Sequence, residues 1–157
     1  MGLFDFVKIC LFSEVNGIVT LNGKPVAGVE VIRTSQMGHD NIYTDKTVTD
    51  EQGRYRFAAR FTHSVRKIAP VEPVITQKIA FFHQDREYLG WEAVKDGYEL
   101  NTELGQPINL ACELGQEPKI KVGEYLINGE HSRRAIYGVC IAEGMSIKEP
   151  TTRKSEE

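Results

Sequence analysis

Two segments, VNGIVTLNGKPVAGVEV at residues 15–31 and TVTDEQGRYRF at residues 47–57, decide the fold of this 157-residue chain. In both, apolar residues alternate with polar ones, which is typical of strands that bury one face. Asn22-Gly23 favours a tight hairpin turn because both residues tolerate positive φ. Asp50 to Gly53 predicts a second turn, with glycine at the left-handed position. We therefore expect antiparallel strands joined by short turns.

The clearest strand is expected at residues 54–61, where aromatic residues share one face with Ala59 and three arginines occupy the other. The segment at 42–49 is rich in Thr, Val, Ile and Tyr, so we expect it to pair with this strand. The polar segment 35–41 is expected to form a loop, and Trp91 is expected in the core. The remaining expected strands lie at 15–21, 28–34, 74–83, 87–94, 108–114, 120–127 and 135–141.

Short strands separated by Gly, Pro and Asn turns predict an all-β sandwich or barrel. We expect an N-terminal segment (1–14), a sandwich of about seven strands (15–114), a C-terminal β-hairpin extension (115–147) and a disordered tail (148–157). The hairpin is expected to have an irregular tip, because residues 130–134 are strongly polar.

The composition is that of an ordinary soluble globular protein, with 41% hydrophobic and 26% charged residues. A net charge of −3 gives no strong field for nucleic acid. The chain has no apolar run of 18 residues, so no transmembrane segment is expected. We expect a cytoplasmic protein; a periplasmic or membrane-associated one, with residues 2–12 touching a membrane surface or a partner, is the alternative.

The three cysteines, Cys10, Cys112 and Cys140, are an odd number and lie far apart in the sequence. Disulfide-stapled secreted domains usually carry an even, dense set. We therefore expect reduced, packed thiols, with Cys112 on a buried strand face. A single Cys112–Cys140 disulfide is the alternative.

No motif for catalysis or cofactor binding stands out. The histidines at 39, 63, 83 and 131 form no pair at metal-ligand spacing. Ser64 follows His63, but adjacent strand residues face opposite ways and no G-x-S-x-G sequence occurs. Gly23-Lys24 lacks the rest of a P-loop. We expect no catalytic residue, no metal and no cofactor.

Arginine and tyrosine favour protein interfaces, so they supply the candidate partner-binding residues. An arginine stripe on one strand face would suit an acidic partner, although a solvated outer face is the plainer interpretation. The C-terminal hairpin adds a basic pair and two tyrosines expected to be exposed. The candidates are Arg54, Arg56, Arg60, Tyr125, Arg133, Arg134 and Tyr137.

The blocks Asn16-Gly17-Ile18-Val19, Gly23 to Val31 and Thr47 to Phe57 resemble the carboxypeptidase regulatory-like domains. These belong to the wider transthyretin-like, or prealbumin-like, β-sandwiches. The resemblance covers residues 15–61 closely and extends towards Leu114. It implies an antiparallel transthyretin-like β-sandwich used as a non-catalytic spacer, carrier or interaction module. The hydroxyisourate hydrolases share this sandwich and end in Tyr-Arg-Gly-Ser, whereas this chain ends in Arg-Lys-Ser-Glu-Glu.

The segments FFHQDREYLGWEAVKDGYELN and INLACEL are similar to a group of proteobacterial proteins often encoded beside type VI secretion genes. This similarity implies a protein partner, and most concretely an immunity protein that binds and neutralises a toxic effector. A secretion accessory or adaptor protein is the alternative, and a prealbumin-like hydrolase is a more distant one.

Overall fold

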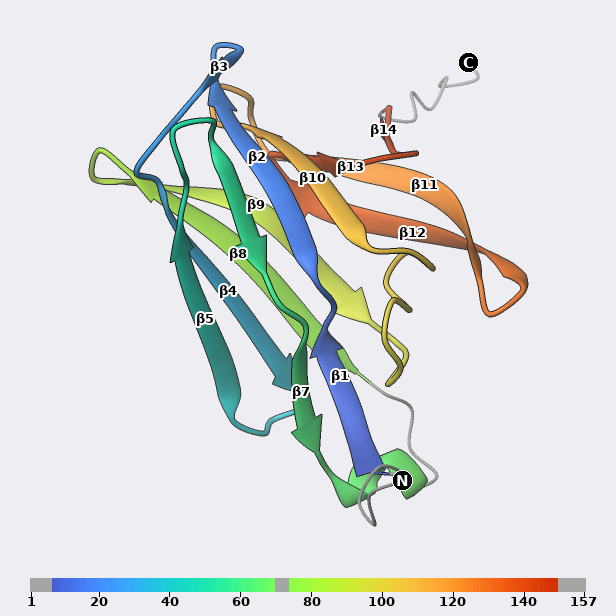
Figure 1. Cartoon of the computed structure of the whole chain (residues 1–157). Coiled ribbons are helices and arrows are strands. Elements are labelled where there is room, and N and C mark those ends of the chain that lie inside the picture. The colour runs from blue at the N-terminus through green and yellow to red at the C-terminus, as the bar shows by residue number, and fades with distance from the viewer. Residues whose placement is uncertain (1–6, 70–73, 150–157) are drawn as a thin grey trace, which may run out of the picture.

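The computed structural model describes residues 7–69 and 74–149 and is an open all-β sandwich (Figure 1). The predicted fold class is therefore confirmed. The predictions made for residues 2–6 and 150–157 lie outside the described residues. The short 3-10 helix η2 (Val65–Ile68) interrupts the strands at one end of the molecule.

The larger sheet has seven strands in the order β14-β11-β12-β9-β8-β4-β5, and its neighbouring strands pair antiparallel. We call it the wide sheet. Its strands are β4 (Glu30–Met37), β5 (Ile42–Val48), β8 (Ile75–His83), β9 (Arg86–Lys95), β11 (Lys119–Ile127), β12 (Glu130–Gly138) and β14 (Ser146–Ile147).

The second sheet, the narrow sheet, has the order β13-β10-β2-β3, and β6 also pairs with β2. The β2–β10 pair is parallel, in contrast to its other pairings. Two further strands, β1 and β7, form an antiparallel ribbon below it in Figure 1. The strands are β1 (Lys8–Phe12), β2 (Val15–Leu21), β3 (Lys24–Pro25), β6 (Arg54–Phe57), β7 (Arg60–His63), β10 (Ile108–Glu113) and β13 (Cys140–Ala142).

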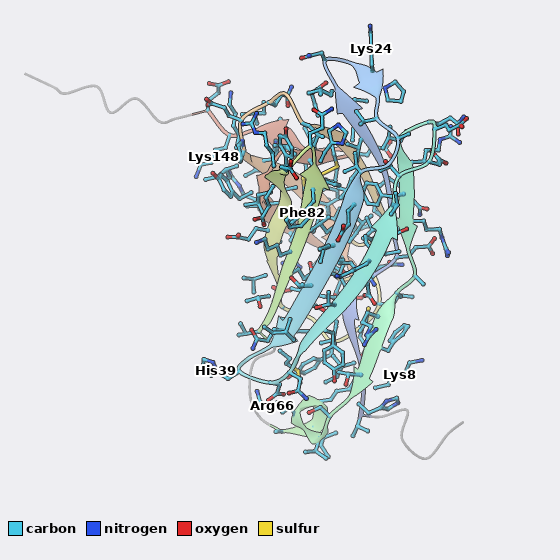
Figure 2. The ribbon with its side chains drawn as sticks, turned by 90° about the vertical axis from the view of Figure 1, so that its left-hand side faces the viewer. Lys8, Lys24, His39, Arg66, Phe82 and Lys148 are labelled. Atoms are coloured by element: carbon cyan, nitrogen blue, oxygen red, sulfur yellow. A yellow bond between two sulfur atoms is a disulfide. The ribbon has the colours of Figure 1, made fainter. Side chains whose placement is uncertain are left out.

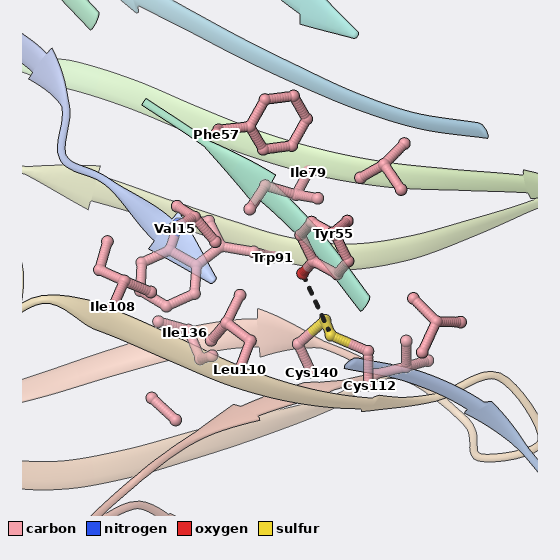
Figure 3. Close-up of a cluster of buried hydrophobic side chains, with 14 of the residues drawn as sticks. Val15, Tyr55, Phe57, Ile79, Trp91, Ile108, Leu110, Cys112, Ile136 and Cys140 are labelled. Carbon is pink, nitrogen blue, oxygen red and sulfur yellow. Dashed lines mark hydrogen bonds between the residues drawn. A yellow bond between two sulfur atoms is a disulfide. The ribbon is translucent and has the colours of Figure 1, made fainter. Parts of the chain in front are cut away.

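The core fills the space between the two sheets (Figure 3). Alternate residues of β2 and β6, such as Val15, Val19 and Tyr55, point inward and are buried. They meet inward residues of the wide sheet, including Trp91, which is 1% exposed, as predicted for the core. Burying each large apolar side chain contributes about 1.5–3 kcal/mol. The alternation read from the sequence therefore does describe the packed faces of the sandwich.

Cys112 and Cys140 form a disulfide, so the prediction that they are reduced is wrong. The two residues lie opposite each other on paired strands β10 and β13, which the long sequence separation concealed. Burial of Cys112 was predicted correctly, and the hydroxyl of Tyr55 lies 3.5 Å from its Sγ. Cys10 is a free, buried thiol.

The strand expected at 54–61 is divided, because β6 pairs with β2 whereas β7 pairs with β1. The alternation consequently slips at Ala58 and Ala59, and Phe61 is exposed rather than buried. The segment 42–49 was also assigned to the wrong neighbour. It forms β5, which pairs with β4 at the edge of the wide sheet.

Two polar segments are strands where loops or irregular structure were expected. β4 continues to Met37, because its outward residues can be polar while Ser35 and Met37 are buried. The C-terminal hairpin turns tightly at Asn128-Gly129, where both residues have positive φ. Its strand β12 then pairs with β9, so the hairpin extends the wide sheet.

Candidate functional site

A groove of about 990 Å³ lies over the outer face of the narrow sheet. We call it the narrow-sheet groove. Its floor comes from β2, β6 and β10, and its sides come from β5 and the segment after β13. It is lined by Asn16, Gly17, Ile18, Thr47, Val48, Asp50, Arg54, Tyr55, Arg56, Asn109, Leu110, Ala111, Ile141, Ala142, Glu143, Gly144 and Met145.

The strand register arranges the floor in rows. Ile141, Ala111, Ile18 and Arg54 are successive cross-strand partners, so an apolar row ends in a guanidinium group. In the neighbouring row, Asn109 and Asn16 lead to Arg56. Outward side chains of a sheet stand perpendicular to it. Ala111, Asn109 and Asn16 are shorter than the arginines at the ends of the rows, so the surface is hollow where they lie.

Gly17, on the β2 strand beneath the groove, faces the core. It pairs with Tyr55, and a Cβ atom at residue 17 would lie 2.2 Å from the Tyr55 ring. The ring therefore occupies the space that a side chain at 17 would need. Burial raises the pKa of the Tyr55 hydroxyl.

Arg54 and Arg56 both line the narrow-sheet groove but differ in their partners. Arg56 Nε donates to Glu14 Oε1 at 2.8 Å, and this hydrogen bond and charge lower the pKa of the exposed Glu14 carboxyl. Arg54 is exposed and has no ion pair with the described residues. Its charge is therefore available to a partner.

Arg60, the third member of the predicted stripe, lies elsewhere. The slip at the β6–β7 junction turns it towards Asp45, with which it forms a 3.0 Å ion pair. The same carboxylate binds the buried Arg33 at 2.8 Å, while Arg33 also donates to the carbonyl of Ala58. Arg60 thus belongs to a structural network between β5 and β7.

The candidates from the C-terminal hairpin do not form one cluster. Tyr125 is buried, so its expected exposure is wrong, and its hydroxyl donates to the carbonyl of Glu143 at 2.7 Å. Burial and the nearby Glu143 charge raise its pKa. Arg134 donates to Asp96 at 3.0 Å. Arg133 and Tyr137, an even number of residues apart on β12, are exposed on the outer face of the wide sheet.

That outer face carries a second groove of about 660 Å³, to which Tyr137 contributes. Cross-strand pairing places Ile120, Tyr137, Glu92, Lys78 and Thr34 in one row across five strands. The narrow-sheet and wide-sheet grooves therefore lie on opposite outer faces of the sandwich.

A smaller pocket of about 410 Å³ brings together His39, Asp40 and His63 near the start of η2. The sequence presents these histidines in separate segments. Asp40 forms a 3.2 Å ion pair with Arg66, and the hydroxyl of Ser64 accepts from the Arg66 backbone. Within residues 7–69 and 74–149, no group of three or more acidic, His or Cys residues is arranged to hold a metal ion.

The apolar half of the narrow-sheet groove was missed by sequence reasoning. Ile18 was treated as part of a structural strand, although its outward position follows from the same alternation that buries Val19. Ala111 and Ile141 become neighbours of Ile18 only through the parallel β2–β10 pairing, which no local sequence pattern predicts.

Among the described residues, no helix is long and apolar enough to cross a membrane. No curated protein and no solved structure has a significant match to the chain. A family model described as a domain of unknown function, DUF6795, matches residues 15–117. This range takes in the strands that build the floor of the narrow-sheet groove. The chain therefore belongs to the DUF6795 family.

Proposed function

We propose that this chain is a non-enzymatic protein-binding module that uses the narrow-sheet groove to hold an acidic partner surface. The observation that carries the proposal is the row Ile141–Ala111–Ile18–Arg54, where an apolar floor ends in a guanidinium that forms no ion pair with the described residues. Apolar contact supplies binding free energy, and a charge beside it selects and orients the partner.

The chemistry of the groove lining suits binding better than catalysis. Its residues include no histidine, cysteine, serine or lysine, the groups that most often act as nucleophiles or transfer protons. The acidic residues of the lining are Asp50 and Glu143. Asp50 accepts from the backbone of Gln52 and Arg54 and so fixes the turn before β6.

The most concrete form of this role is an immunity protein that neutralises a toxic type VI secretion effector. The support is the similarity of residues 81–101 and 108–114 to proteins encoded beside type VI secretion genes. Neutralisation would follow if the rim of the narrow-sheet groove covers the effector's active site and Arg54 contacts acidic residues of the effector.

Co-expression tests this function. Cells that express the protein encoded beside this chain's gene are grown with and without this chain. The immunity proposal expects poisoning without the chain and growth with it. If the neighbouring protein is harmless, or if the chain neither binds it nor restores growth, the immunity role is contradicted.

A secretion adaptor is the alternative form of a binding role. Deleting an adaptor would reduce secretion without poisoning the cell, whereas deleting an immunity protein would leave the cell open to its own effector. The Cys112–Cys140 disulfide supports a periplasmic location for either role, because disulfides persist in oxidising compartments and are rare in the cytosol.

A further inference from the structure

The end of the sandwich that carries η2 exposes a small cluster of apolar side chains, which we call the apolar cluster. Val65 and Ile68 on η2 are 73% and 64% exposed, and Val65 is the most exposed large apolar side chain among the described residues. Phe61, on strand β7, which precedes η2 in the chain, is also exposed. Figure 1 shows η2 beside the start of β1, at the opposite end from β3.

Contacts with β1 and the adjoining turns hold η2, and with it the apolar cluster, in place. The Ser64 amide donates to the carbonyl of Val7 at 2.9 Å, and Lys67 Nζ donates to the carbonyl of Lys8 at 2.7 Å. Arg66 is held by Asp40 at 3.2 Å. The exposed apolar side chains therefore project from a fixed turn.

Cationic side chains lie near the apolar cluster. Lys8, Arg66 and Lys67 lie at this end, and Figure 2 shows Lys8 and Arg66 there with His39. Lys8 Nζ sits 4.2 Å from the centre of the Phe61 ring. Asp40 pairs with Arg66, and Glu99 pairs with Lys67. The three cations and these two carboxylates together carry one net positive charge when histidines are neutral, whereas the whole chain carries −3.

We propose that this end docks on the surface of an anionic lipid bilayer, independently of the groove. Val65 and Ile68 enter the boundary between head groups and acyl chains, and Lys8 and Arg66 face lipid phosphates. Apolar residues with a basic rim are the pattern of interfacial membrane contact.

A bilayer fits this surface better than a protein pocket does. Val65 and Ile68 stand on a convex turn, so a protein partner would have to supply a matching cavity around them. Acyl chains are fluid and adapt to a projecting side chain without such a cavity. The apolar side chains Ile42 and Val94 are also largely exposed, but they line the hollow of the wide-sheet groove.

Vesicle co-sedimentation of the full chain tests the proposal. The vesicles contain equal parts of phosphatidylcholine and phosphatidylglycerol, and a parallel set contains phosphatidylcholine alone. The test variant is V65S/I68S, and the matched control is I42S/V94S, which removes two apolar residues of the wide sheet that are 62% and 61% exposed. Thermal melts establish that both variants are folded.

The chain is expected to sediment with anionic vesicles and less with neutral ones. V65S/I68S should weaken this binding about tenfold or more, because two inserting side chains are lost, while I42S/V94S should bind like the unaltered chain. Failure of the unaltered chain to sediment with anionic vesicles would overturn the proposal. Equal loss in both variants, or full binding by V65S/I68S, would also overturn it.

Discussion

Ser13 and Glu103 are 90 residues apart in sequence, and two hydrogen bonds join them in the interior. The Ser13 amide donates to Glu103 Oε2 at 2.8 Å, and its hydroxyl donates to Oε1 at 2.6 Å. Gln77 Nε2 also donates to this carboxylate at 3.1 Å. Ser13 and Glu103 are both buried. The Glu103 carboxylate thus ties the loop before β10 to the β1–β2 junction and to β8.

Replacement of Glu103 should destabilise the fold strongly. Each buried hydrogen bond to a charged group contributes about 1.5–3 kcal/mol, and its loss leaves buried donors unsatisfied. We expect Glu103→Ala to lower the free energy of unfolding by about 3 kcal/mol in urea denaturation. Glu99→Ala, at an exposed glutamate nearby, should cost less than about 1 kcal/mol. Equal effects would contradict this role for Glu103.

Gly17 is expected to tolerate no side chain while Tyr55 is present. A Cβ atom at 17 would overlap the Tyr55 ring, so Gly17→Ala should cost about 1–3 kcal/mol through overpacking. In a Tyr55→Ala background the ring is gone, and the same substitution should cost much less. A double-mutant cycle measured by urea denaturation checks this coupling. Additive costs would show that the ring does not set the requirement for glycine.

Thiol counting tests the disulfide. The denatured chain should react with one equivalent of a thiol reagent before reduction and three after it, since only Cys10 is free. The folded chain should react slowly, because burial raises the pKa of the Cys10 thiol. Loss of the disulfide in C112S/C140S should cost about 3–4 kcal/mol for a loop of this length. Three reactive thiols in protein isolated without reductant would contradict the bond.

Lys95 should make the stability of the protein depend on pH. Its ammonium is buried and donates to the carbonyls of Gly97 and Glu99, and burial lowers its pKa below 10.5. Between the lowered folded pKa and 10.5, the unfolded chain binds more protons at this site than the folded chain does. The Lys95 contribution to stability therefore rises with pH in that window.

The measurement compares Lys95→Met with the unaltered chain in urea denaturation across the alkaline range. Cys10 and Tyr55 have raised pKa values and oppose the trend, but they are common to both proteins. The stability of the unaltered chain relative to the variant should rise as pH increases towards 10.5. A difference that stays constant with pH would contradict the assignment.

The sandwich could be predicted from local patterns, whereas its strand partners could not. Alternation at residues 15–21 and the Asn22-Gly23 turn identify β2 and its hairpin, because both depend on neighbouring residues alone. The parallel partner of β2 is β10, about 90 residues later, and nothing in either strand specifies that pairing. The assignment of β5 to the wrong neighbour has the same origin.

The candidate site was predictable only in part for a related reason. Arg54 and Arg56 were identified because an outward stripe follows from alternation. Arg60 left the stripe because the chain changes partner after Phe57. Tyr125 is buried beside the segment that follows β13, where its hydroxyl donates to the carbonyl of Glu143. The apolar floor of the narrow-sheet groove depends on three strands meeting in register. Such a surface becomes visible only when the strand order is known.

The most direct test of the account is a calorimetric titration of this chain with the protein encoded beside its gene. Three forms are compared: the unaltered chain, Arg54→Glu in the narrow-sheet groove, and Arg133→Glu on the wide sheet as the matched charge change. The account predicts binding by the unaltered chain and by Arg133→Glu, with affinity at least about tenfold weaker for Arg54→Glu. No binding by the unaltered chain, or equal affinity in all three forms, would contradict it.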